Sequence, residues 1–134
     1  MNISSFDDLV LAARQQTQPQ QLLFVFATAE LPDDATPEQR AGFEQGVGGA
    51  LVPATCVDKT LDDISDFSAI KREASQFVKN WCVLFASSLS GADTLPPAQE
   101  KIQSALDRMV EAIKLGAFAN MIAFDDAGQA IALE

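Results

Sequence analysis

The chain has 134 residues, of which 48% are hydrophobic and 21% charged, and its formal net charge at pH 7 is −10. This length suits a single domain over residues 1–134, and the apolar content supports a packed core, which excludes general disorder. The acidic excess repels a phosphate backbone, so it excludes nucleic acid and anionic membrane surfaces as expected partners.

A helix is predicted over residues 4–16, where Ser5 and Asp8 resemble a capping box. Its apolar side chains recur at helical spacing and form one face, made of Phe6, Leu9, Val10 and Ala13. Pro19 separates this helix from a strand over residues 21–30. The run from Leu22 to Ala27 in that strand is continuously apolar, which is typical of a central strand with both faces buried.

A second, short helix is predicted over residues 37–45. Thr36 can cap this helix, Pro37 suits its first position, and Gln39 can close a capping box. The next predicted strand covers residues 50–57 and contains Pro53, which restricts it to a sheet edge or a bulge.

Three glycines, Gly46, Gly48 and Gly49, lie between these two elements. A phosphate-binding glycine loop leaves a strand and enters a helix, because the phosphate sits against the exposed N–H groups of that helix. Here the order is reversed. We therefore interpret Gly46 as the residue that ends the helix in a left-handed turn.

Residues 60–80 predict one long amphipathic helix that begins with a capping box of Thr60 and Asp63. Its apolar stripe comprises Leu61, Ile64, Phe67, Ile70, Ala74, Phe77 and Val78. Residues 81–86 follow as a second buried strand, and residues 87–97 indicate a polar loop.

Residues 97–115 give the clearest helix signal, and Gly116 ends that helix. Residues 118–124 and 129–133 then predict a β-hairpin around a turn at residues 125–128. The predicted order is therefore α-β-α-β-α-β-α-β-β.

This order predicts an α/β or α+β fold, with a mixed sheet of about five strands packed with about four helices. The alternation favours some parallel neighbours joined by right-handed crossovers, and the alternative is an α+β sandwich with helices on one face only. The strands around Phe24 and Leu84 should be neighbours in the sheet, covered by the helix around Met109.

The residue types present limit the chemistry. Histidine and tyrosine are absent, which excludes Ser-His-Asp and Cys-His arrangements and removes the commonest ligand of transition metals. Four Asp-Asp pairs occur, at residues 7–8, 33–34, 62–63 and 125–126, and helix starts and a hairpin turn account for them. We therefore expect no metal and no cofactor, with an aspartate-based divalent-metal protein as an alternative.

A candidate ligand site follows from the expected parallel strands, because ligands bind beyond the carboxyl ends of such strands. The polar residues at these ends form a rim of Thr28, Glu30, Asp58, Lys59, Thr60, Ser87, Ser88 and Ser90. Asp58 and Lys59 would serve as polar or acid–base groups and Ser88 as a positioning group. Polar residues also occur wherever strand ends meet water, so a plain surface role is the alternative.

Two cysteines, Cys56 and Cys82, fit neither a disulfide framework nor a C-x-x-C motif, so we expect free thiols. Cys82 is expected in the core. Core packing is also favoured for Cys56, and the alternative is a thiol activated by Lys59. Asn120 interrupts an apolar strand and either satisfies a neighbouring backbone group or points at a ligand.

The N-terminal residues place no basic region before an apolar run, and no stretch approaches the roughly eighteen apolar residues of a membrane span. The expected location is therefore the cytoplasm.

The run LLFVFATAELPDDATPEQRAGFEQGVGGALVP, followed by CVDK and later by RMVEAI, resembles a family of short uncharacterised proteobacterial proteins. The likeness covers nearly the full chain and includes no catalytic motif. Some members carry the label of a ribonucleotide reductase subunit. That enzyme needs a large barrel and several redox cysteines, which two widely spaced thiols do not supply, so the resemblance implies no functional residue.

These observations favour a small binding or protein-interaction module over an enzyme. The strand over residues 129–133 should offer an exposed sheet edge that pairs with a second copy or with a protein partner. The alternative is a small-ligand-binding enzyme that uses the polar rim.

Overall fold

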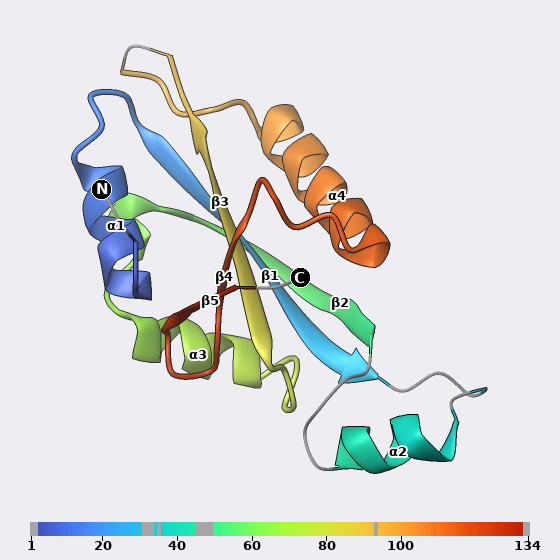
Figure 1. Ribbon diagram of the computed structural model, residues 1–134. Helices are drawn as coiled ribbons and strands as arrows, with labels where there is room; N and C mark the ends of the chain where they lie inside the picture. The colour runs from blue at the N-terminus through green and yellow to red at the C-terminus, as the bar shows by residue number, and fades with distance from the viewer. Residues whose placement is uncertain (1–2, 31–33, 35, 45–49, 93, 133–134) are drawn as a thin grey trace.

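The computed structural model describes residues 3–30, 34, 36–44, 50–92 and 94–132. Helices and strands alternate as the sequence predicts, and the C-terminal strands form the expected hairpin (Figure 1). The elements are α1 (Phe6–Arg14), β1 (Gln20–Glu30), α2 (Pro37–Glu44), β2 (Ala50–Thr60), the short 3-10 helix η1 (Leu61–Asp63), α3 (Phe67–Ser75), β3 (Val83–Ser90), α4 (Gln99–Leu115), β4 (Ile122–Phe124) and β5 (Ala130–Ile131). Gly46, Gly48 and Gly49 lie outside the described residues.

Five strands form one sheet in the order β2-β1-β3-β4-β5, and each described neighbouring pair is antiparallel. The expected neighbourhood of the strands around Phe24 and Leu84 is confirmed, because Phe26 pairs with Leu84. The expected parallel pairs and their crossovers are wrong. Figure 1 gives the reason at the first connection, where α2 lies beyond the ends of β1 and β2 and does not cross a face of the sheet.

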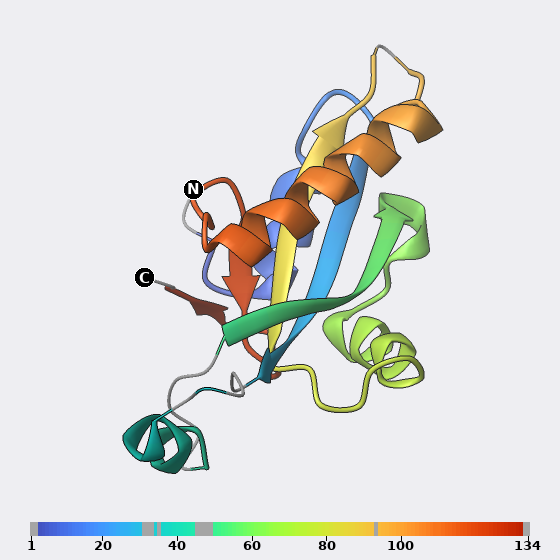
Figure 2. The ribbon, with the colours of Figure 1, turned by 90° about the vertical axis from the view of Figure 1, so that its right-hand side faces the viewer.

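Helices cover both faces of the sheet, so the alternative with one covered face is wrong (Figure 2). On one face, α1 and α3 pack against Leu22, Phe24 and Phe26 of β1. On the other, α4 packs against Leu23, Val25 and Ala27. The expected cover by the helix around Met109 is therefore confirmed. Alternate side chains of β1 are buried on opposite faces, which explains its continuous apolar run.

The predicted capping box forms in full at α2 and in part at α1. Ser5 Oγ accepts the N–H of Asp8 at the start of α1, although the Asp8 carboxylate bonds to Ser4. At α2, Thr36 Oγ1 accepts the N–H of Gln39, and Gln39 Oε1 accepts the N–H of Thr36. These bonds satisfy N–H groups that have no partner within the helix.

The long helix predicted over residues 60–80 is wrong. The structure has η1, an extended residue at Ile64, and then α3, whose N-cap Asp66 accepts the N–H of Ala69 at 2.9 Å. Thr60 instead donates to the Asp63 carboxylate at 2.9 Å. Because β2 continues to Thr60, the backbone is still extended where the helix was expected to begin. At its other end α3 stops at Ser75, so Phe77 lies beyond it and is 70% exposed.

The strands β2 and β3 are longer than predicted, so the residues from Ser87 to Ser90 belong to β3 and not to a loop. Pro53 acts as the sequence predicts. It lies on the edge strand, at a register shift where Phe26 pairs with Thr55 but Ala27 pairs with Pro53. Ala54 is thus an extra residue on β2, as in a β-bulge.

The C-terminal hairpin is closed by polar contacts and by the N-terminal segment. Asp125 Oδ1 accepts the N–H groups of Ala127 and Gln129, and Gly128 adopts a left-handed φ of 81°. The N–H of Ala130 donates to Ser4 O at 2.9 Å, and the N–H of Phe6 donates to Gly128 O at 2.8 Å. Within the described residues, no helix is long and apolar enough to cross a membrane.

Candidate functional site at the open edge of the sheet

The antiparallel register divides the predicted rim between the two ends of the sheet. Thr28 and Glu30 lie at the C-terminal end of β1, and Glu30 pairs with Ala50. The other rim residues flank the N-terminal end of β1, with Asp58, Lys59 and Thr60 on β2 and with Ser87, Ser88 and Ser90 on β3. The prediction placed these groups together because it assumed parallel strands.

The residues at the N-terminal end of β1 are divided again between the two faces. Leu22 pairs with Lys59 on one side and with Ser88 on the other. Opposed residues share a face, so Lys59 and Ser88 lie on the α1 and α3 face, roughly 10 Å apart across β1. By the same register, Asp58 and Ser87 lie on the α4 face. The rim is therefore not one concave site.

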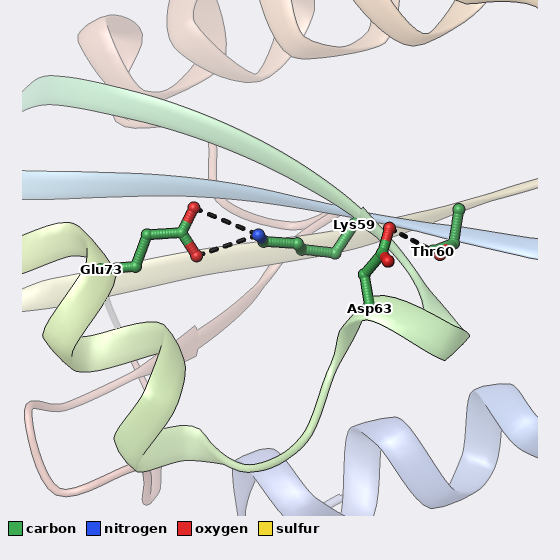
Figure 3. A network of polar contacts seen from close by, with 4 residues as sticks. All are labelled: Lys59, Thr60, Asp63 and Glu73. Atoms are coloured by element: carbon green, nitrogen blue, oxygen red, sulfur yellow. Dashed lines mark hydrogen bonds and ion pairs between the residues drawn. The ribbon is translucent and has the colours of Figure 1, made fainter.

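Lys59 is held by Glu73 of α3, as Figure 3 shows. The Lys59 ammonium lies 2.9 Å from Glu73 Oε2 and 3.1 Å from Oε1. Because this pair is partly exposed, it stabilises the fold by no more than about 1 kcal/mol. It fixes the Lys59 side chain on the face away from Cys56.

Two of the remaining rim residues, Asp58 and Ser90, are bonded to two glutamines that the sequence did not single out. Gln21 Nε2 donates to Asp58 Oδ2 at 2.8 Å, and Gln20 Nε2 donates to Ser90 Oγ at 2.8 Å. Both glutamines are buried. Two polar residues directly before the apolar run of β1 were the available signal, because buried amides must find partners.

The outer side of β2 is the open edge of the sheet. Backbone groups of successive strand residues point alternately to the two neighbouring strands. The N–H of Gly91 donates to Pro19 O at 2.8 Å, so the odd-numbered residues of β1 form hydrogen-bonded pairs with β3. The even-numbered residues of β1 therefore form hydrogen-bonded pairs with β2. The bonded residues of β2 are therefore Thr55, Val57 and Lys59. Cys56 and Asp58 direct their N–H and C=O groups outward.

A groove of about 380 Å³ runs beside this edge. Its lining comes from β2, α3 and the segment after α3, and consists of Thr55, Cys56, Val57, Asp58, Lys59, Glu73 and Phe77. Phe77 is 70% exposed, so it presents a large apolar side chain next to outward backbone groups. We call the surface formed by these seven residues the β2 edge site.

Cys56 is exposed at this site, so the prediction of core packing is wrong. Partial burial of its sulfur and the negative charge of Asp107 raise the pKa of the Cys56 thiol. A raised pKa keeps the thiol protonated at neutral pH, which is the opposite of activation. Cys82 is half-buried and packs against the core on the α4 face, with its pKa raised chiefly by burial.

The alternative prediction of an aspartate-based metal site rests on the four Asp-Asp pairs. Among the residues that the structure describes, no three His, Cys, Asp or Glu side chains gather closely enough to hold a metal ion. Asp8, Asp63 and Asp125 are hydrogen-bonded within their own helix start or turn, and Asp33 lies outside the described residues.

Comparisons with protein-family models, with curated proteins and with solved structures find no match to this chain. The resemblance to the family of short proteobacterial proteins therefore stays a prediction, and function has to be inferred from the geometry of the molecule.

Proposed function

We propose that this chain is a protein-interaction module that binds an extended segment of a partner protein at the β2 edge site. The supporting observation is the free side of β2. This strand of 11 residues pairs with β1 alone among the described strands. An exposed strand edge is a template for pairing with another chain.

The other edge, where the sequence analysis expected the contact, offers less. β5 has 2 residues, and the segment around Ser4 already bonds to Ala130 beside it. The β2 edge is longer, and its central residues direct backbone donors and acceptors outward. The proposal therefore keeps the expected mode of recognition and moves it to the opposite side of the sheet.

A bound segment would gain affinity from two sources. Backbone hydrogen bonds to Cys56 and Asp58 contribute roughly 0.5–1.5 kcal/mol each, and they align the segment antiparallel or parallel to β2. An apolar side chain of the segment that covers Phe77 adds about 1.5–3 kcal/mol. Specificity then depends on which side chains face Phe77 and the Lys59–Glu73 pair.

Charge favours a basic partner over a second copy. The chain has a formal net charge of −10, so two copies repel each other, whereas a basic segment is attracted. The groove itself holds Asp58 and the mutually neutralised Lys59 and Glu73. The experiment below therefore distinguishes self-association through β2 from binding of a basic partner.

The test uses selection from a displayed library of unstructured decapeptides, with matched variants of the edge. Cys56→Pro removes one outward N–H and leaves the bonded residues of β2 unchanged, whereas Cys56→Ala keeps the N–H. Selected peptides should bind the wild type and Cys56→Ala, and should lose binding to Cys56→Pro and to Phe77→Ala. Leu115→Ala, which truncates another exposed apolar residue outside the β2 edge site, is the control.

Peptides that bind Cys56→Pro as tightly as the wild type would overturn the proposal, provided that the variant unfolds at the same urea concentration. Sedimentation at several concentrations then separates the occupants. If the wild type is a dimer and Cys56→Pro is a monomer, the β2 edge binds a second copy of the chain. If the wild type is a monomer, the basic partner segment is the expected occupant.

A further inference from the structure

A second site lies on the α4 face, away from the β2 edge site. A pocket of about 320 Å³ opens between β3, α4 and the segment that follows α4. This volume is at the lower end of the range for small-molecule sites. We propose that this pocket binds a small organic carboxylate, with the carboxylate on Arg108 and the apolar part of the molecule inside.

The hollow arises from the sequence of α4. Large side chains at Ile102, Leu106, Met109 and Ile113 fill the space between this helix and the sheet. Ala105 and Ala112, on the flank of that stripe, line the pocket together with Arg108. Positions 105, 108 and 112 share one helical face, so two small residues on either side of the arginine leave room for a ligand.

Arg108 supplies the positive charge at this pocket. Within the described part of the chain, no hydrogen bond or ion pair engages its guanidinium. It is also the single charged residue among those that line the pocket. The planar guanidinium matches a carboxylate through two parallel hydrogen bonds.

The sheet adds polar groups beside this arginine. β4 begins at Ile122, which pairs with Ala86, so the β3–β4 ladder stops before Ser87 and Ser88. The N–H of Asp125 donates to Gln129 O, so the odd-numbered residues of β4 form hydrogen-bonded pairs with β5. The even-numbered residues of β4 therefore form hydrogen-bonded pairs with the even-numbered residues of β3. Ser88 therefore directs its backbone N–H and C=O toward the side where β4 would continue.

Asn120 lies in the turn before β4, two residues from Ile122, and it lines the same pocket as Ser88. Its amide and the hydroxyl of Ser87 are further donors for an anion. The rest of the lining is largely apolar and includes Leu23, Leu89, Met109 and Met121. The donors would bind an anionic head group, and the apolar side chains would cover an apolar body. An organic carboxylate combines these two parts.

The experiment measures binding of four probes by calorimetry and by the shift in melting temperature. Hexanoate and benzoate carry the proposed chemistry, hexanamide has the same body without charge, and phenyl phosphate has a different anion. The expected result is that the two carboxylates bind and raise the melting temperature, while hexanamide binds at least about tenfold more weakly, because it lacks hydrogen bonds between charged groups.

Two variants locate the site and one controls for charge. Arg108→Gln should weaken hexanoate binding by about tenfold or more and leave the fold intact, since this side chain is exposed. Ala112→Leu should fill the pocket and abolish binding of both carboxylates. Lys114→Gln removes a positive charge from the same helix outside the pocket, where Lys114 pairs with Glu111, and should bind hexanoate like the wild type.

Each of three results would overturn the proposal. These are equal binding of hexanoate and hexanamide, an unchanged affinity in Arg108→Gln, and no heat or stabilisation from either carboxylate at low-millimolar concentration. Preference for phenyl phosphate over both carboxylates would also reject the assigned ligand class. Because the β2 edge variants do not touch this pocket, failure of one proposal leaves the other unaffected.

Discussion

Replacement of Phe6 by alanine should be among the most damaging single changes in this protein. Phe6 is 1% exposed, and its ring centroid lies 5.5 Å from that of Phe24, 5.4 Å from Phe67 and 5.9 Å from Phe124. One side chain on α1 thus contacts β1, α3 and β4. Truncation of a buried Phe costs about 3–5 kcal/mol of unfolding free energy, out of a total of about 5–15 kcal/mol for a typical domain.

Urea unfolding followed by tryptophan fluorescence measures this loss. Trp81 is the chain's one tryptophan, and it is buried against Phe26 and Phe67, so its emission reports the same core. Leu11→Ala on the exposed side of α1 is the matched control, because Leu11 is 53% exposed and should change stability by no more than about 0.5 kcal/mol. Similar losses in the two variants would show that α1 does not close over this face.

Two further predictions concern a turn and an acidic group. Gly128→Ala should destabilise the protein by about 1–3 kcal/mol in urea unfolding, because φ is 81° and the new Cβ would lie 3.0 Å from the Phe67 ring. Gly116→Ala, at φ 73° with open space around it, should cost less, and an equal cost would refute the role of the ring. Hydrogen bonds from the Ser4 hydroxyl and N–H lower the pKa of Asp8. A lowered folded pKa gives stability that is present above the unfolded value, near 4, and is lost as the pH falls through the folded value. Asp8→Asn should therefore lose stability at neutral pH and show a weaker decline in acid, and an unchanged pH profile would contradict this.

The order of the elements could be predicted from the sequence because it depends on local patterns. The capping box at Thr36 and the edge role of Pro53 involve neighbouring residues, and both are confirmed. Strand direction was not predictable in this way, because hydrophobic periodicity is the same for parallel and antiparallel strands. The start of α3 was mistaken because Thr60 and Asp66 both suit a cap, and the extension of β2 decides in favour of Asp66.

The candidate sites depend on contacts between distant parts of the chain. Lys59 meets Glu73 only because α3 packs under β2, which no spacing within the sequence indicates. Arg108 was overlooked because it continues the polar face of α4. The alanines at positions 105 and 112 were the available signal, since small residues beside an apolar stripe leave space against a neighbouring strand.

The bond from Phe6 N–H to Gly128 O joins segments separated by almost the entire described chain. Contacts of such long range slow folding, because the entropy of closing a large loop is lost before the contact forms. A nascent chain stalled before residue 122 would hold the first helix without Phe124 and would leave an aromatic surface open to chaperones. We therefore expect cooperative folding to begin only after the hairpin has left the ribosome, which arrest-peptide force measurements on successive lengths can time.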